Sequence, residues 1–231
     1  MPKDVAALRI PVMALLLICL PWPSAADPGW RSLFNGADLT GWRGYKNAAA
    51  PTRWRVEDGA ITWTPDGGNG DLVSAEAFGD FELALEWKIA EGGNSGIIYF
   101  VQEIDGADQT YATGPEMQVL DDAQHPDGKL PSHRAGALYD LIPPSAAAAK
   151  PPGQWNAARI VARGGRIEHW LNGRRVVSTR YGNDAWRTLV AGSKFDAMPH
   201  FAKVPRGRIA LQDHGDRVQY RNIRIRTFAA K

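Results

Sequence analysis

Residues 114–122 place acidic and amide groups at regular spacing inside an otherwise apolar run. Side chains alternate between the two faces of a β-strand, so Glu116 and Gln118 share one face and the apolar residues between them share the other. Asp121 falls in the apolar phase unless a β-bulge turns it round. The alternative without chemical function is a polar, solvent-exposed strand face. The chemical alternative is a carboxyl and an amide that line a ligand groove and move protons.

Histidines form a second candidate set. His125 and His133 follow the acidic strand, and His214 lies in a Gln-Asp-His-Gly segment near the C-terminus. Neutral imidazole is a natural proton acceptor and also a metal ligand. Because carboxylate and imidazole suit divalent cations, Glu116, Asp121 and His125 form a candidate metal site. The spacing is not diagnostic of a metal, and each histidine taken alone is more often an ordinary surface or structural residue.

Four further polar residues are candidate ligand contacts. Asn94 follows two glycines and opens an apolar strand, where its amide can bind a ligand or cap a turn. Arg134 and Tyr139 belong to a short segment after the histidine loop, and Gln212 lies two residues before His214. The sequence contains no nucleophile-elbow serine motif, no phosphate-binding glycine loop and no dinucleotide fingerprint. Acyl transfer, phosphoryl transfer and dinucleotide-dependent redox chemistry are therefore disfavoured.

These residues must be positioned by β-strands. Residues 81–89 alternate strictly between apolar and mainly charged side chains, which is typical of a half-buried strand. Asp-Gly at 58–59, Gly-Gly at 164–165 and Asn-Gly at 172–173 predict tight hairpins. A phase change near residues 221–222 predicts a β-bulge in the last strand. With ten or more strands and little room for helices, we expect an all-β, two-sheet antiparallel jelly-roll sandwich of the concanavalin A-like type.

The N-terminus indicates export. A short positively charged segment precedes an apolar run that is too short to span a membrane, and Ser24 and Ala26 fit a small-residue cleavage site. We therefore expect a secretory signal peptide at residues 1–26, a single domain at 27–231, and a periplasmic or secreted location. Ile18 before Cys19 does not fit a lipoprotein signal, so no stable membrane anchor is expected. With 27 basic and 25 acidic residues interspersed, a nucleic-acid partner is not expected either.

Many short motifs, taken in order, resemble the 3-keto-disaccharide hydrolase family. They are Phe34-Asn35-Gly36-Ala37-Asp38-Leu39-Thr40-Gly41-Trp42, Asp80-Phe81-Glu82-Leu83, Asn94-Ser95-Gly96-Ile97, Pro115 to Asp121, Trp155-Asn156, Leu171-Asn172-Gly173, Gly207 to Gly215 and Arg221 to Ile225. Each motif is modest, but together they cover nearly the whole chain after residue 26. Many relatives carry an arginine shortly after the Asn-Ser-Gly motif, where this chain has Ile98-Tyr99-Phe100-Val101.

The resemblance implies cleavage of glycosides already oxidised at C3 of the sugar ring. A C3 ketone acidifies the C2 proton, so a base can remove it, expel the C1 substituent and leave water to add afterwards. For such a mechanism we predict His133 or His214 as base and Glu116 and Asp121 as acids or metal ligands, because these residues cluster on the presumed groove strands. On the same basis, the predicted sugar contacts are Asn94, Gln118, Tyr139, Gln212 and Arg134. The resemblance also implies a carbohydrate substrate, a sugar 3-dehydrogenase as functional partner and, as an open option, a divalent metal ion.

Three other interpretations stay open. Lectins share this fold, so a non-catalytic sugar-binding module is one of them. The acid-x-amide-x-x-acid spacing at Glu116, Gln118 and Asp121 is similar to that of laminarinase-type retaining glycosidases, which would make Glu116 and Asp121 a carboxylate pair. The third is a structural protein of the cell surface.

Overall fold

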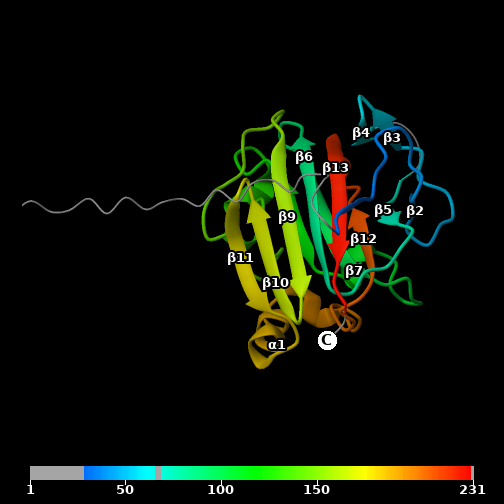
Figure 1. Ribbon diagram of the computed structural model, residues 1–231. Helices are drawn as coiled ribbons and strands as arrows, with labels where there is room; N and C mark the ends of the chain where they lie inside the picture. The colour runs from blue at the N-terminus through cyan, green and yellow to red at the C-terminus, as the bar shows by residue number, and fades with distance from the viewer. Residues whose placement is uncertain (1–28, 66–68, 230–231) are drawn as a thin grey trace, which may run out of the picture.

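Two antiparallel β-sheets form the body of the protein. The computed structural model describes residues 29–65 and 69–229, so the expected signal peptide at 1–26 lies outside the described part. The larger sheet runs in the order β11-β10-β9-β6-β13-β4-β3, with β1 paired to β13, and the smaller runs in the order β2-β5-β12-β7-β8 (Figure 1). The described chain thus confirms the expected all-β, two-sheet antiparallel sandwich.

The strands have the following bounds. The eight-stranded sheet contains β1 (Arg31–Ser32), β3 (Trp54–Glu57), β4 (Ala60–Trp63), β6 (Phe81–Ile89), β9 (Asn156–Arg163), β10 (Arg166–Leu171), β11 (Arg174–Arg180) and β13 (Val218–Thr227). The five-stranded sheet contains β2 (Trp42–Gly44), β5 (Leu72–Ser74), β7 (Asn94–Val101), β8 (Glu116–Leu120) and β12 (Arg208–Leu211).

Period-two patterning explains how the sheets bury their inner faces. In β6 the apolar residues Phe81, Leu83, Leu85 and Trp87 are each at most 1% exposed and belong to the main core. Their cross-strand partners on β9 begin with Ala162 and continue in register along the same face. Because burial of apolar area is the main stabilising term, this shared face fixes the register of the central strands.

Tight turns connect the strands where the glycine-containing dipeptides predict them. Asp58 and Asn172 adopt positive φ angles of 50° and 48° at the first turn position, ahead of a glycine that also has positive φ. The hairpins β3–β4 and β10–β11 follow directly from these turns. The β-bulge predicted in the last strand is also present, because the β13–β6 register shifts between Arg221 and Arg224.

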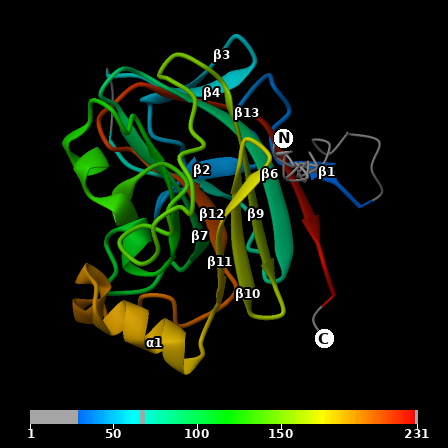
Figure 2. The ribbon, with the colours of Figure 1, turned by 90° about the vertical axis from the view of Figure 1, so that its left-hand side faces the viewer.

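Short helices decorate the sandwich and were not expected from the sequence. Helix α1 (Asp184–Ala191) begins at Asn183, whose side chain accepts a hydrogen bond from the Trp186 backbone, and it buries only Trp186. The 3₁₀ helices are η1 (Thr110–Ala112), η2 (Pro126–Lys129), η3 (Pro131–His133) and η4 (Lys194–Ala197). Figure 2 shows α1 and η4 at one end of the two layers. Eight residues with one buried side chain are too few to give a helical period in the sequence. Within the described residues, no helix is both long and apolar enough to cross a membrane.

Candidate active site

The acidic strand β8 presents its polar side chains away from the core, as its alternation predicts. Met117 and Val119 join the main core, whereas Glu116 and Gln118 line a cavity on the other face of the five-stranded sheet. The segment after the histidine loop closes the free edge of β8, because Tyr139 donates its backbone N–H to the Glu116 carbonyl at 3.1 Å. Two polar side chains are therefore held within a sheet rather than on a loop.

The cavity has a volume of about 170 Å³ and is lined almost entirely by groups that can hydrogen-bond. Its lining residues are Asn94, Tyr111, Glu116, Gln118, Tyr139, Lys194, Gln212 and His214. Sites for drug-sized ligands usually measure roughly 300–1,000 Å³, so this one suits a ligand of about one ring with many polar groups.

Gly96 makes room for the Glu116 carboxyl group. Gly96 lies on β7 opposite Gln118, two pairs along from Glu116 and its partner Ile98 and therefore on the same face. A Cβ atom at position 96 would lie 2.3 Å from Oε1 and 2.7 Å from Cδ of Glu116. The Glu116 side chain thus lies across the backbone of its neighbouring strand, in a place that only glycine leaves free.

Burial dominates the electrostatics of Glu116, which is 4% exposed. The pKa of Glu116 is raised to about 8, chiefly by burial, with the Lys194 cation opposing the rise and the negative charges of Asp71 and Asp127 adding to it. Asp71 itself lies beneath Thr110 and accepts the Asp213 backbone N–H at 2.8 Å, and burial raises the pKa of Asp71 to about 6. At neutral pH Glu116 is therefore a protonated acid, poised to donate a proton.

Lys194 supplies a positive charge at the cavity wall. Its ammonium nitrogen lies 4.2 Å from the ring centroid of Tyr139 and 5.4 Å from that of Tyr111. Its backbone N–H donates to Asp140 Oδ2 at 2.8 Å, which anchors the start of η4. Burial and the charge of Asp127 raise the pKa of the Tyr139 hydroxyl, which donates to Asp127 Oδ2 at 3.3 Å. A cation packed between two aromatic rings can stabilise negative charge that develops on a bound ligand.

Asn94 and His214 lie side by side in the lining of the cavity. The Asn94 side-chain nitrogen lies 3.4 Å from His214 Nε2, and the Asn94 backbone N–H donates to Asp216 Oδ2 at 3.0 Å. Asn94 Oδ1 is enclosed and has no hydrogen-bond partner within the protein. Since buried polar atoms are normally paired, this oxygen is positioned to accept a hydrogen bond from a ligand.

Four residues predicted as functional do not line the cavity. Asp121 is used by a turn, where its carboxylate accepts the backbone N–H groups of Gly92 and Ala123. His125 caps η2 by accepting the Asp127 N–H at its Nδ1. These positions correct the pairing of Asp121 with Glu116. Burial of Asp121 in the turn leaves no second carboxylate from β8 beside Glu116 for a retaining mechanism.

The other two are His133 and Arg134. His133 packs behind Tyr139, with ring centroids 4.3 Å apart, and its Nε2 lies 3.1 Å from Asp140 Oδ1. Arg134 points away and donates its Nε–H to the Gly128 carbonyl. His133 therefore supports the Tyr139 wall from outside the cavity, and Arg134 is not in position for the predicted sugar contact.

The predicted metal ligands do not assemble. In residues 29–65 and 69–229, no three His, Cys, Asp or Glu side chains come together as a ligand set, so Glu116, Asp121 and His125 do not form the predicted site. Glu116 instead lies beside the Lys194 cation, whose positive charge lowers its pKa. Donors of this kind do not fit a divalent ion that seeks several carboxylate or imidazole ligands.

Sequence reasoning missed three contributors to the site: Tyr111, Lys194 and the supporting Asp71. They lie in connecting segments or at the end of a short strand, where no periodicity fixes the direction of a side chain. The sequence offers no signal for Lys194, because its placement depends on the burial of Phe195 and on the backbone hydrogen bond to Asp140.

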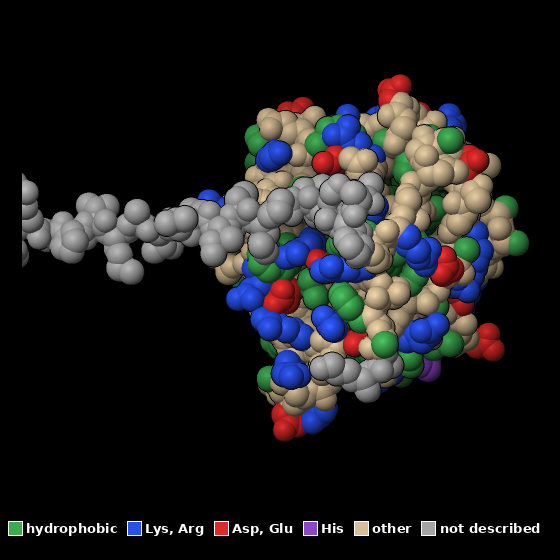
Figure 3. Space-filling model, viewed as in Figure 1, with side chains coloured by type: hydrophobic (Ala, Val, Ile, Leu, Met, Phe, Trp, Pro, Cys, Tyr) green, Lys and Arg blue, Asp and Glu red, His purple; other side chains and the backbone are tan. Residues whose placement is uncertain are grey.

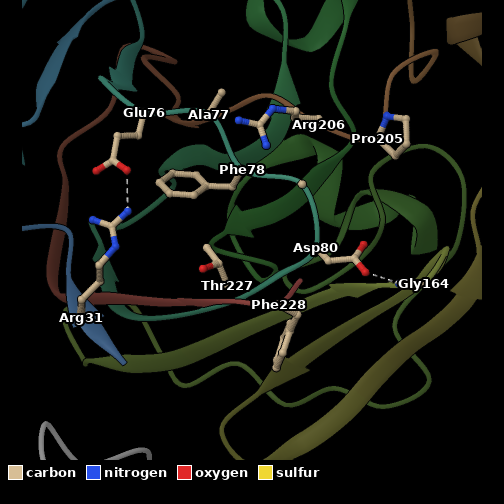
Figure 4. Close-up of a pocket in the computed structure, with 11 residues that line it drawn as sticks. Arg31, Glu76, Ala77, Phe78, Asp80, Gly164, Pro205, Arg206, Thr227 and Phe228 are labelled. Carbon is tan, nitrogen blue, oxygen red and sulfur yellow. Dashed lines mark hydrogen bonds and ion pairs between the residues drawn. The ribbon is translucent and has the colours of Figure 1, made fainter. Parts of the chain in front are cut away.

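A larger cavity, about 650 Å³, lies at a different place in the fold, between the approach to β6 and the end of β13. Figure 4 shows Phe78 in its middle, with Arg31 paired to Glu76 and Asp80 paired to the backbone of Gly164. One of its two arginines is thus paired with a carboxylate, and its one other carboxylate is held by a backbone N–H. It gathers no acid beside a free base, which favours the smaller cavity as the active site.

The comparison with protein families decides between the open interpretations. The model described as the 3-keto-alpha-glucoside-1,2-lyase-like domain matches residues 29–226. The chain belongs to this family. The match spans both sheets and every residue that lines the cavity, so membership in the lyase-like family applies to the site as well as to the fold.

Relatives of the lyase-like family agree with this assignment. A Bacteroides thetaiotaomicron protein named 3-keto-disaccharide hydrolase is 38% identical over 235 residues, covering 90% of this chain and 81% of the relative. A crystal structure of a glycosyl hydrolase candidate from Parabacteroides distasonis ATCC 8503 is 32% identical, with a TM-score of 0.79, covering 87% and 94% of the two chains.

The fold recurs in more distant proteins. A Bacillus subtilis protein of galectin-like fold has a TM-score of 0.53 at 11% identity, covering 87% of this chain and 96% of that one. This likeness concerns the sandwich alone. Together with the family assignment, the named relative identifies the chain as an enzyme that acts on carbohydrate.

Proposed function

We propose that the chain cleaves 3-keto-disaccharides, and 3-keto-glycosides more generally, by elimination across C1 and C2 followed by hydration. The family match and the name of the Bacteroides relative support the substrate class. The observation that carries the chemistry is Glu116, a buried carboxyl whose pKa is raised to about 8, in a polar cavity beside a lysine cation. A protonated acid is what an alkoxide leaving group requires at neutral pH.

The first step breaks the C2–H bond. His214 Nε2 takes the proton, and the electron pair of the C–H bond forms an enolate with the C3 ketone. The amide nitrogen of Asn94 beside Nε2 favours the tautomer that carries its proton on Nδ1. The Nε2 lone pair becomes free to take the C2 proton when the bound sugar draws the Asn94 amide into its own hydrogen bonds. The Lys194 ammonium stabilises the negative charge that builds on the C3 oxygen.

The second step breaks the bond from C1 to the bridging oxygen. Electrons of the enolate form a C1–C2 double bond, and the departing oxygen takes the proton of Glu116. Water then adds its oxygen to C1 and a proton returns to C2, which yields the free 3-keto sugar. Gln118, Gln212 and Asn94 Oδ1 hold the ring hydroxyls through hydrogen bonds. No step here passes through a metal ion, since the cavity does not gather ligands for one.

The decisive experiment compares a 3-keto-glucoside with its unoxidised parent in D₂O. We expect turnover of the ketone alone, with deuterium at C2 of the product, because hydration delivers a solvent proton there. A control without enzyme measures spontaneous exchange next to the ketone. Equal turnover of both glycosides, with hydrogen retained at C2, would establish an ordinary glycosidase. Retention on glycans without turnover of either would establish a sugar-binding module.

The location and the functional partner are part of the proposal. The pattern of residues 1–26 supports export to the periplasm or beyond, and Edman sequencing of the protein from the periplasmic fraction should begin near Asp27. A 3-keto substrate must be made by oxidation of a sugar hydroxyl, so an upstream sugar 3-dehydrogenase is required by the chemistry. A chain that keeps Met1 in the cytoplasm would contradict the proposed location.

A further inference from the structure

The outer face of the eight-stranded sheet, which points away from the active site, is dense in arginine. Strand register places eight arginines on this one face of β6, β9, β10, β11 and β13, because the residues between them enter the core. We call this set the arginine face: Arg159, Arg163, Arg166, Arg175, Arg180, Arg221, Arg224 and Arg226. Figure 3 shows basic side chains gathered over these strands.

Carboxylates on the same five strands are too few to neutralise the arginine face. Glu82, Glu86 and Glu168 are the acidic residues of those strands. Glu82 is shared between Arg159 and Arg226, and Glu168 is likewise shared between two arginines. With Lys88 of β6 added to the eight arginines, this face has six more basic than acidic groups, whereas the whole chain, with 27 basic and 25 acidic residues, has only two more. Basic and acidic residues are thus interspersed along the sequence, but in the folded protein the basic residues are concentrated on this face.

Arg224 marks where a ligand group would bind. Its Nε is enclosed but has no hydrogen-bond partner in the described chain, and the residue lines a cavity of about 390 Å³. Arg31 also lines this cavity, together with Asn35 and Asn222 as neutral polar groups and with the ring of Trp30. The lining contains no carboxylate, although Arg31 also lines the larger cavity of Figure 4 and pairs there with Glu76.

We propose that the arginine face binds an acidic polysaccharide through its carboxylate or sulfate groups, and so holds the enzyme on a carbohydrate matrix. Guanidinium groups pair with such anions in bidentate geometry. A linear chain can lie over the strands and send a group into the Arg224 cavity, which a flat bilayer cannot do. Leu130 and Val204, the large apolar side chains that are strongly exposed in the described chain, lie outside these strands, so they are not available to insert into lipid at this face.

The location of the arginine face lets both surfaces work at once. The active site opens on the five-stranded sheet, and the core separates that sheet from the arginine strands. The biological role as a tether rests on the proposed function, since it presumes a carbohydrate-cleaving enzyme. The binding itself does not, because it requires neither the ketone substrate nor Glu116.

The test measures binding of the full chain, without residues 1–26, to polygalacturonate and dextran sulfate, with neutral dextran as reference. We expect salt-sensitive binding to both acidic polymers and none to dextran. Arg163→Gln with Arg180→Gln removes two charges that pair with no carboxylate in the structure, and should weaken binding about tenfold. Arg224→Gln should weaken it as well. The matched control, Lys129→Gln with Lys203→Gln, removes two exposed charges outside the arginine face and should change binding less than twofold.

Several outcomes overturn the proposal. Equal losses in the arginine variants and the lysine control would reduce the effect to net charge. Tighter binding to phosphatidylglycerol vesicles or to duplex DNA than to either polymer would assign the face to another partner. Urea unfolding of each variant separates loss of binding from loss of fold. Glu116→Gln, expected to stop cleavage yet bind the polymers normally, keeps this test independent of the proposed function.

Discussion

Replacing Glu116 with Gln should remove a large loss of stability that alkaline pH causes in this protein. The unfolded chain has an ordinary glutamate pKa near 4.5, and burial raises that of the folded state to about 8. Between these values the folded state holds the proton more tightly, so the wild-type protein loses stability as pH rises. From pH 5 to pH 9 the loss is about 4 kcal/mol. Glu116→Gln has no such proton and should escape this loss.

The assay is urea unfolding of both proteins at pH 5, 7 and 9, followed by tryptophan fluorescence. The stability of Glu116→Gln relative to wild type should climb steadily across this range, by about 4 kcal/mol in total. Glu91→Gln, at an exposed carboxyl, is the control and should show no such climb. A relative stability of Glu116→Gln that stays constant from pH 5 to 9 would mean that Glu116 ionises normally, and its assignment as the acid would have to be abandoned.

Three further changes test the site. Gly96→Ala pushes a Cβ to 2.3 Å from Glu116 Oε1, so we expect a loss of about 1–3 kcal/mol in stability and of most activity; full activity on the 3-keto substrate would disprove the close approach. Lys194→Gln should lower kcat and raise the pKa of the alkaline limb of the kcat profile, since Lys194 lowers the pKa of Glu116; a shift towards acid would contradict this. His214→Asn should lower kcat/KM by about 10²–10⁴-fold and abolish C2 deuterium exchange, and persistent exchange would remove His214 as the base.

The sequence predicted those parts of the molecule that depend on alternation or on turn chemistry. Strand β6, the glycine hairpins and the bulge after Arg221 follow from periods and dipeptides that have few alternative conformations. The same logic brought Glu116 and Gln118 to one face and into one cavity. A strand fixes the direction of each side chain, so its chemistry can be read before its structure is known.

Residues outside strands were harder to place. His133 and Arg134 lie beside a 3₁₀ helix, where no repeat fixes which way a side chain points, and both point away from the cavity. Lys194 was missed for the same reason: it reaches the site from a short turn that follows α1. Its placement depends on the burial of Phe195 and on the bond to Asp140, which are tertiary contacts.

The fit of Glu116 over Gly96 makes one functional feature depend on two consecutive strands, β8 and β7. Neither residue can be substituted alone without loss. A larger residue at position 96 would displace the Glu116 carboxyl group, and a shorter acid at position 116 would leave an empty space over the Gly96 backbone. Engineering this acid into another β-sandwich would therefore require the glycine and the glutamate to be introduced together. A sequence search that requires both Gly96 and Glu116 should therefore distinguish enzymes of this kind from β-sandwich proteins that have only the same fold.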